Sequence, residues 1–384
     1  MCPSQTIYQW RDLFMHNLPR LSAPQAMELA LWSIGSVLAN SSTLTRVVVE
    51  LAAWLKIGVE TIRQRLRDLY LPADVKRGDK RVELGVEESF ADLFAWVLSL
   101  LPGPRVALAL DASLIKDRFA VLCASVLVGG CAIPVAWKVL PANQKGEWKT
   151  HWLALLSRLA SASVDREVYV LTDRGISADW LFRAICKNGW HPMLRINSDG
   201  FFKPERDTWR TLKAMVSKDG QPVCVPGVAW KKSRLPCVLL AFWGAQAKEP
   251  WLLLTDQALE PSAASWYGLR MGIEHQFKVF KSGGLQCENG RIKDPARVER
   301  LWLAYAVSAV TRLSHGSAAE QTGQFDWKTN QRRRKDGTKA RRVSLWHKGR
   351  AQLLNAIWNS HVEIACPLFQ IDIWPMCSAI NNTS

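Results

Sequence analysis

Two aspartates each follow an apolar run that reads as a buried strand. Asp111 comes after VALAL, and Asp173 comes after EVYVLT. Parallel α/β sheets present functional groups at the C-terminal ends of their strands, so neighbouring strands would bring both carboxylates to one edge. With a third acid they would form an oxygen-rich site suited to Mg²⁺ or Mn²⁺, and two ions ~3.5–4 Å apart can serve in-line phosphoryl transfer. The pair alone is explained better by turns or helix caps, where Asp is common.

A third carboxylate comes with three polar neighbours at helical spacing. Tyr267, Arg270, Glu274 and Lys281 stand at offsets of 0, 3, 7 and 14 residues, which predicts one helical face. The simpler interpretation is a solvated face with an Arg–Glu pair at i, i+4. Since two strand-end aspartates precede this helix, however, Glu274 supplies the missing acid. His275 would point about a quarter-turn away and is interpreted as a packing neighbour.

The spacing Y-x2-R-x3-E-x6-K resembles the signature of a large family of bacterial insertion-sequence transposases. These are cut-and-paste enzymes of the DDE type with an RNase H-like core. The resemblance extends to the LALD strand at Asp111, the LTDRG strand at Asp173, and a β-rich insertion between the second aspartate and the glutamate. It covers residues 105–310, and all four signature positions match.

The resemblance implies a role for each signature residue. Two Mg²⁺ or Mn²⁺ ions would be coordinated by Asp111, Asp173 and Glu274. The DNA near the cleaved end would be held by Tyr267, Arg270 and Lys281. In relatives, a tryptophan of the insertion stacks on a flipped base, and the candidates here are Trp230, Trp243 and Trp251. Each of these tryptophans is also explained by a structural role.

From residue 105 onward the sequence pattern indicates the strands and helices that must position the three acids. The pattern predicts the order β-β-β-α-β-α-β up to residue 196, which is compatible with a mixed sheet covered by helices. The uncharged stretch 119–137 is long enough for a membrane span, but Gly129-Gly130 and Pro134 predict a hairpin of two buried strands instead. A long helix is expected from Ser262 to Gly283-Gly284.

The first hundred residues are predicted to be helical. Residues 45–70 read as two helices broken at Lys56-Ile57-Gly58, the second running from about Val59 to Tyr70. This resembles a helix-turn-helix whose second helix would present Arg63 and Arg67 to DNA. A plain helical hairpin with a solvated face explains the pattern nearly as well.

The charge balance favours a polyanionic partner. The 384 residues carry 50 Lys+Arg against 34 Asp+Glu, a net charge of +16. Residues 326–350 hold ten of the basic and two of the acidic residues, which concentrates the charge in one segment. Its core is a basic run predicted to bind DNA phosphates as a flexible arm, comprising Arg332, Arg333, Arg334 and Lys335. The alternative is a solvated loop.

These patterns predict an α/β protein built on an RNase H-like mixed sheet flanked by helices. The expected parts are a helical DNA-binding domain (1–100), a catalytic core (101–196 and 257–315), a β-rich insertion (197–256) and a basic, helical C-terminal region (316–384). The nine Cys form no CxxC pair, and no signal peptide is evident, so we expect a cytoplasmic protein with free thiols.

The predicted function is DNA transposition. The partners would be the terminal inverted repeats of a mobile element and its target DNA, with a homodimer in the synaptic complex and no membrane. Two alternatives stay open. One is a metal-dependent nuclease or resolvase of the same fold that cuts without joining, and the other is a non-catalytic DNA-binding protein derived from a transposase.

Overall fold

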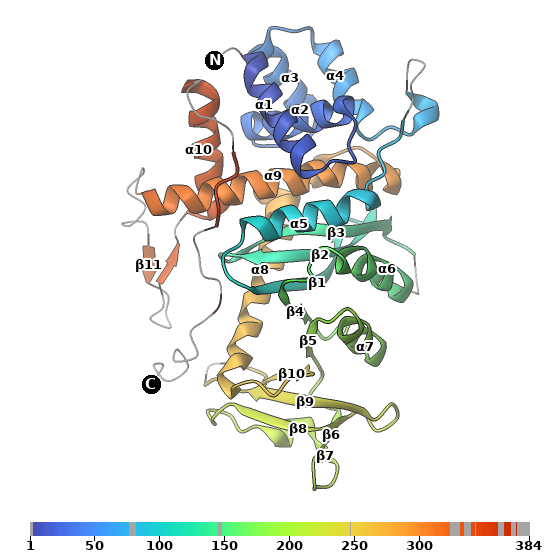
Figure 1. Cartoon of the computed structure of the whole chain (residues 1–384), viewed down its shortest axis with the longest axis vertical. Coiled ribbons are helices and arrows are strands. Elements are labelled where there is room, and N and C mark those ends of the chain that lie inside the picture. The colour runs from blue at the N-terminus through green and yellow to red at the C-terminus, as the bar shows by residue number, and fades with distance from the viewer. Residues whose placement is uncertain are drawn as a thin grey trace. The chain divides into compact units, whose positions relative to one another are not determined.

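The chain divides into two compact units that are interleaved in sequence. The computed structural model describes residues 3–76, 82–144, 148–245, 247–322, 331–333, 339–341, 343–359, 365–369 and 374 (Figure 1). Unit 1 comprises residues 1–103, 112–146 and 272–372, and unit 2 comprises residues 104–111, 147–271 and 373–384. The predicted division into four functional regions is a different one and stays a prediction.

Unit 2 is organised around three parallel strands. They are β1 (Arg105–Ile115), β4 (Glu167–Thr172) and β5 (His191–Arg195). Their middle residues are buried and mostly Val, Leu and Ala, as expected for a parallel sheet covered on both faces. Contrary to the sequence prediction, β1 does not end at Asp111 but continues to Ile115. Its parallel pairing with β4 ends earlier, at Leu110.

The predicted β-rich insertion adds strands to the same sheet of unit 2. Beyond β5 the order is β10-β9-β8-β6-β7, all antiparallel. The strands are β6 (Phe201–Pro204), β7 (Arg210–Thr211), β8 (Val223–Ala229), β9 (Leu235–Phe242) and β10 (Trp251–Thr255). The insertion therefore continues the sheet instead of forming a detached β subdomain. A short 3₁₀ turn, η3 (Leu212–Met215), follows β7.

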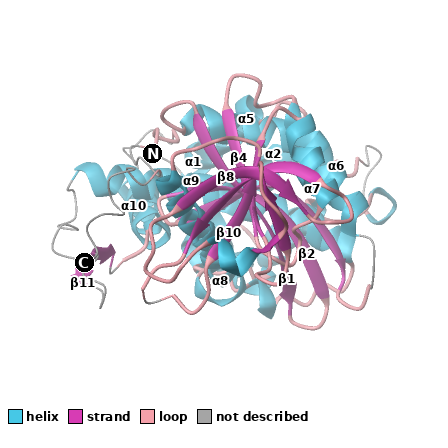
Figure 2. Ribbon diagram, turned by 90° about the horizontal axis from the view of Figure 1, so that it is seen from below, coloured by secondary structure: helices cyan, strands magenta, loops and turns pink. Residues whose placement is uncertain are grey.

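Two helices accompany the parallel strands of unit 2, and Figure 2 shows the twist of the strands beside them. They are α6 (Trp148–Ala160) and α7 (Asp179–Lys187). The buried face of α6 presents Trp152 and Leu155, and α7 ends where Gly189 adopts a positive φ of 73°. These helices supply the crossover connections that parallel strands require.

Unit 1 contains the predicted hairpin. Strands β2 (Phe119–Val128) and β3 (Cys131–Pro141) pair antiparallel, and both residues of the Gly129-Gly130 turn have positive φ, as a type I′ turn requires. The register shifts between Ala124 and Ser125, and Ser125 pairs with Pro134, whose ring nitrogen cannot donate to the ladder. The hairpin interpretation of the uncharged stretch is therefore confirmed, and no helix within the described ranges is long and apolar enough to cross a membrane.

The N-terminal part of unit 1 is helical, as predicted. Its helices are α1 (Pro3–Asn17), α2 (Ala23–Ala39), α3 (Leu44–Leu55), α4 (Val59–Asp68) and α5 (Phe90–Leu100), with short 3₁₀ turns η1 (Ala73–Val75) and η2 (Glu87–Ser89). The predicted break between α3 and α4 is confirmed: Lys56 ends α3 in the left-handed conformation. Ile62 and Leu66 form the buried stripe of α4, and the Trp32 indole donates to the Leu66 carbonyl oxygen at 2.7 Å.

A long helix forms the core of unit 1. Helix α9 (Pro295–Thr322) is buried on all sides from Glu299 to Ser317. Helix α10 (Leu345–Asn359) crosses it so closely that a Cβ at Gly349 would lie 1.7 Å from the Arg312 carbonyl oxygen. Part of the basic segment, predicted to be a flexible arm, forms a short antiparallel pair of β11 (Gln331–Arg333) with β12 (Lys339–Arg341).

The segment 261–283 is helical but not a uniform α-helix. It begins as a 3₁₀ helix, η4 (Pro261–Arg270), continues as α8 (Met271–Lys278) and ends in a π-helical turn, η5 (Val279–Gly283), followed by the 3₁₀ turn η6 (Cys287–Asn289). The boundary between the units falls at Met271. The prediction of one regular helical face along this segment is therefore wrong in detail, since 3₁₀ and π turns do not have a period of 3.6 residues.

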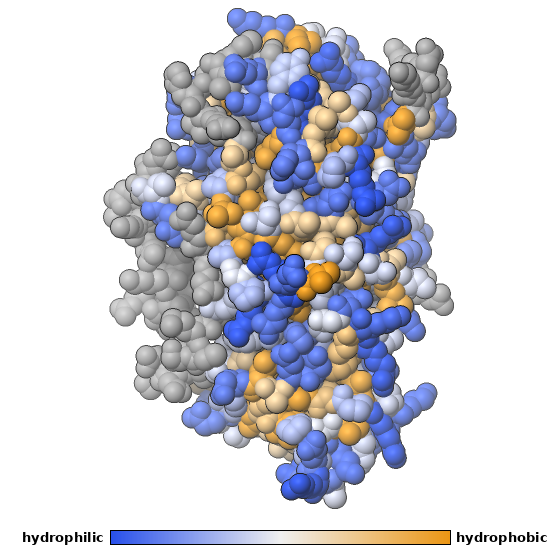
Figure 3. All heavy atoms as spheres, viewed as in Figure 1, coloured by the Kyte–Doolittle hydropathy of each residue, from blue (hydrophilic) through white to orange (hydrophobic). Residues whose placement is uncertain are grey.

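The predicted fold class is confirmed. The chain is mixed α/β, with a mixed sheet flanked by helices. The order β3-β2-β1-β4-β5 is consistent with an RNase H-like core. On the face drawn in Figure 3, hydrophilic residues predominate, with hydrophobic ones dispersed among them.

Candidate functional site

The parallel strands of unit 2 align three charged residues. Leu110 of β1 is level with Thr172 of β4, and Thr172 is level with Leu194 of β5. The next residues along these strands are Asp111, Asp173 and Arg195. The strand register therefore brings the two aspartates to the same edge of the sheet, as expected for neighbouring parallel strands.

Arg270 joins the two aspartates. Its Nη2 atom lies 3.1 Å from Asp111 Oδ2 and 3.6 Å from Asp173 Oδ2. The arginine side chain is only 9% exposed, against 16% for Asp111 and 40% for Asp173. Asp173 also accepts a hydrogen bond from the Gly175 N–H at 2.9 Å, so the turn role anticipated for an isolated Asp coexists with the ion pair.

Tyr267 lies one 3₁₀ turn before Arg270, and both residues are buried. Three residues make one turn of a 3₁₀ helix, so the two side chains leave the same side of η4. Trp251 packs edge-on against the Tyr267 ring at 5.4 Å, and the Arg195 guanidinium lies 5.8 Å from that ring's centroid. Burial raises the pKa of the Tyr267 hydroxyl, and the positive charges of Arg270 and Arg195 oppose the rise. The hydroxyl is thus protonated at neutral pH and available as a donor.

The sequence prediction missed two cations beside this cluster. Arg174 Nη1 lies 2.8 Å and Arg195 Nη2 lies 3.7 Å from Glu249 Oε2, so one carboxylate holds both. Arg195 ends β5, and the rule that selected Asp111 and Asp173 would have selected it too. Arg174 follows Asp173 directly, where a turn is the simpler interpretation. Glu249 carried no comparable signal.

Glu274 and Lys281 belong to unit 1, whereas Tyr267 and Arg270 belong to unit 2. Glu274 is exposed on α8 and Lys281 is half-buried in η5. A Cβ at Gly272 would lie 2.5 Å from the Cys131 carbonyl oxygen, which shows how closely α8 approaches the β2–β3 turn. No group of three or more His, Cys, Asp or Glu side chains arranged to hold a metal occurs among the residues the structure describes. The role of Glu274 as a third ligand stays a prediction.

The tryptophans proposed for base stacking occupy different settings in unit 2. Trp230 is half-buried just after β8, where it has a positive φ of 56° and its carbonyl oxygen accepts from the Arg234 N–H. Trp243 follows β9, and its indole donates to the Ala247 carbonyl oxygen at 3.1 Å. Trp251 is the one in contact with a signature residue, Tyr267.

The basic residues predicted to contact DNA elsewhere are placed only in part. On α4, Arg63 pairs with Glu60 at 3.1 Å and Arg67 is exposed. Arg332 and Arg333 belong to β11, while Arg334 and Lys335 lie outside the described residues. DNA contact by any of these side chains stays a prediction.

The strand order, with Asp111 and Asp173 next to each other where the pairing of β1 with β4 ends, is consistent with an RNase H-like core. Residues 126–310 match the transposase DDE domain family. The matched range includes Asp173, Arg270 and Glu274 and begins after Asp111. No curated protein matches the chain.

Proposed function

We propose that this protein is a DNA transposase that binds the terminal inverted repeats of a mobile element, cleaves its ends and joins the freed 3′-OH to target DNA. The observation that carries the proposal is the arrangement of Asp111 and Asp173 around Arg270 in a chain that matches the transposase DDE domain family. If Asp111 and Asp173 only formed turns, neither would need a buried arginine placed between them.

The two aspartates fit a divalent cation. Both direct an oxygen at one cationic nitrogen, so the site already accommodates positive charge between them. Carboxylate oxygens are the ligands that Mg²⁺ and Mn²⁺ prefer. Asp111, Asp173 and Glu274 would hold two such ions, which when bound would activate the attacking hydroxyl and stabilise the leaving oxygen.

The remaining signature residues would position DNA. Arg270 and Lys281 would contact phosphates at the cleaved end, where cations stabilise developing negative charge. Tyr267 would donate a hydrogen bond from its protonated hydroxyl. Arg63, Arg67 and the basic segment from Arg332 to Lys335 would bind flanking phosphates. Synapsis of two element ends would use a homodimer.

The test is cleavage of DNA that carries the element's ends. Asp111→Asn, Asp173→Asn and Glu274→Gln should each lower cleavage by about a hundredfold or more while DNA binding survives. Asp179→Asn is the matched control, because this half-buried aspartate on α7 pairs locally, with Arg183 at 3.1 Å. Retained cleavage in a purified, folded variant of any of the three acids would refute the assignment.

Two further measurements separate the alternatives. A pre-cut end should be joined to target DNA by the wild-type protein, whereas a nuclease or resolvase would cut without joining. Mn²⁺ should raise the melting temperature of the wild-type protein and of Asp179→Asn, but not of Asp111→Asn. A non-catalytic relative would show no such metal dependence.

A further inference from the structure

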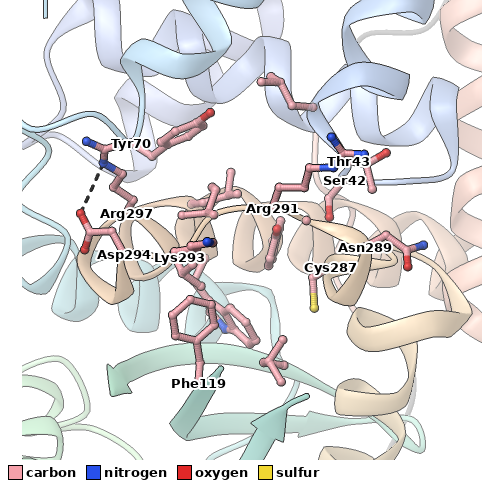
Figure 4. A pocket seen from close by; sticks show the side chains of 18 of the residues that line it. Ser42, Thr43, Tyr70, Phe119, Cys287, Asn289, Arg291, Lys293, Asp294 and Arg297 are labelled. Atoms are coloured by element: carbon pink, nitrogen blue, oxygen red, sulfur yellow. Dashed lines mark ion pairs between the residues drawn. The ribbon is translucent and has the colours of Figure 1, made fainter. Parts of the chain in front are cut away.

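Unit 1 contains a pocket of about 960 Å³ (Figure 4). Its walls come from the start of α3, the end of α4, the turn between β1 and β2, the loop after η6 and the first turns of α9. Of the residues predicted to bind DNA, Arg67 is among those that line it. The volume lies at the upper end of the range typical of small-molecule sites.

The walls of this pocket are strongly basic. One acid, Asp294, lines it with six cations, which are Arg46, Arg67, Arg118, Arg291, Lys293 and Arg297. Arg297 pairs with Asp294 at 3.3 Å, and Arg46 donates to the Gln286 side chain at 3.0 Å. Arg291 and Lys293 are exposed and make no hydrogen bond or ion pair within the described part of the chain. Their charges are therefore available to a ligand.

The loop that carries these two cations is held in place by a third. Arg118 Nη1 donates to the carbonyl oxygens of Gly290 at 2.7 Å and Ile292 at 3.0 Å, and its Nη2 donates to that of Glu288 at 3.2 Å. Three hydrogen bonds from one guanidinium fix the loop before any ligand binds, which lowers the entropic cost of binding. Because carbonyl groups carry no net charge, Arg118 still adds to the positive potential.

Aromatic side chains form the floor of the pocket. Phe119 and Tyr305 line it with 2% and 5% of their surfaces exposed, and Trp302 is fully buried against Tyr305. Figure 4 shows the Phe119 ring below Lys293. A DNA duplex would cross the mouth of such a hollow without filling it. A ligand that fills it needs an anionic group for the rim and a flat apolar part for the floor. Cations combined with aromatic rings are the usual features of sites for unpaired nucleotides.

We propose that this pocket binds one unpaired nucleotide of a DNA strand, with Arg291 and Lys293 on its phosphate and the aromatic floor beneath its base. The assignment rests on the proposed transposase function, since end cleavage and strand transfer produce unpaired nucleotides at DNA ends. It concerns binding alone and requires no chemistry at the pocket.

The test compares the binding of labelled blunt duplex DNA with that of the same duplex carrying a short single-stranded overhang. The overhang should raise the affinity of the wild-type protein about tenfold, the gain expected from one stacked base. An overhang of abasic nucleotides keeps the phosphates but removes the base, and it should lose most of this gain. Equal affinity for blunt, overhanging and abasic ends would overturn the proposal.

Variants locate the effect. Arg291→Ala/Lys293→Ala changes two exposed loop residues and should abolish the overhang gain. The control Lys149→Ala/Lys187→Ala removes the same charge from exposed positions on α6 and α7 and should keep the gain. Loss of blunt-duplex affinity to the same extent in both double variants, with the overhang gain intact, would show general electrostatics and overturn the proposal.

A free mononucleotide has the same phosphate and base as the unpaired nucleotide of a DNA end and could occupy the same pocket. Addition of a mononucleotide should compete away the overhang gain only at concentrations far above those of the DNA end. Thermal stabilisation by the mononucleotide without any overhang gain would overturn the assignment to a DNA strand. None of these readouts depends on cleavage, so failure here and failure of the Asp111, Asp173 and Glu274 variants are separate results.

Discussion

Glu28 of α2 should make the stability of this protein fall as the pH rises from about 4.5 to about 7. Its side chain is partly buried, and no hydrogen-bond partner for its buried Oε2 atom is found among the described residues. Burial raises the pKa of Glu28 to about 7, opposed by Lys76 and assisted by Asp68. The folded protein therefore keeps a proton that the unfolded chain has already released.

The magnitude follows from linkage. Each pKa unit corresponds to ~1.4 kcal/mol, so a rise from 4.5 to about 7 corresponds to ~3 kcal/mol. Between these two values the folded state binds more protons than the unfolded state, and stability declines as the pH rises. The effect is absent below the unfolded pKa and complete above the folded one. Glu28→Gln keeps the shape of the side chain and removes its charge.

We expect Glu28→Gln to be more stable than the wild type by ~3 kcal/mol at pH 8 and by less than ~1 kcal/mol at pH 4.5. Urea denaturation at both values measures the difference. Glu50→Gln on α3 is the control, because that glutamate is exposed. A difference between Glu28→Gln and the wild type that does not change with pH would refute the argument.

Two further predictions concern the core of unit 1. Gly349→Ala should destabilise the protein by about 3 kcal/mol or more, because the new Cβ would lie 1.7 Å from the Arg312 carbonyl oxygen. The control Gly58→Ala should be tolerated, because the nearest atom to its Cβ would be 3.8 Å away. Equal melting temperatures of the two variants would contradict the prediction. Burial lowers the pKa of His315 to about 4. Since the unfolded chain binds this proton first, the free energy of unfolding should fall as the pH drops from 6.5 to 4, by ~3 kcal/mol in total. His315→Gln should flatten that decline in denaturation midpoints, and parallel pH curves would argue against it.

The fold was predictable where one apolar pattern decided the structure. The apolar runs before Asp111 and Asp173 indicated buried strands, and Gly129-Gly130 indicated a tight turn between two more, in agreement with β1 to β4. The extension of β1 to Ile115 was not predictable, because Ala-Ser-Leu-Ile after an aspartate is neutral between strand and turn. Likewise, no pattern within the insertion indicated that β10 would pair with β5 and continue the sheet.

The site was predictable in part for the same reason. Strand-end logic found Asp111 and Asp173, and applied to β5 it would have found Arg195. Periodicity failed between Tyr267 and Lys281, because the hydrogen bonding of the segment changes from 3₁₀ to α to π, and residue spacing does not report that change. The basic pocket could not be predicted from the sequence, since its cations are spread along the chain from Arg46 to Arg297 and no local pattern joins them.

What separates a site from two ordinary turns here is Arg270, not the aspartates. Asp173 makes the turn bond to Gly175 that an isolated aspartate would make, so its position alone argues nothing. An arginine that is 9% exposed is costly to bury unless carboxylates oppose it, and two carboxylates side by side are costly unless a cation lies between them. The two carboxylates therefore offset the cost of burying Arg270, and Arg270 offsets the repulsion between the two carboxylates. A sheet edge arranged in this way is arranged to hold positive charge, which is the requirement that metal-assisted phosphoryl transfer places on it.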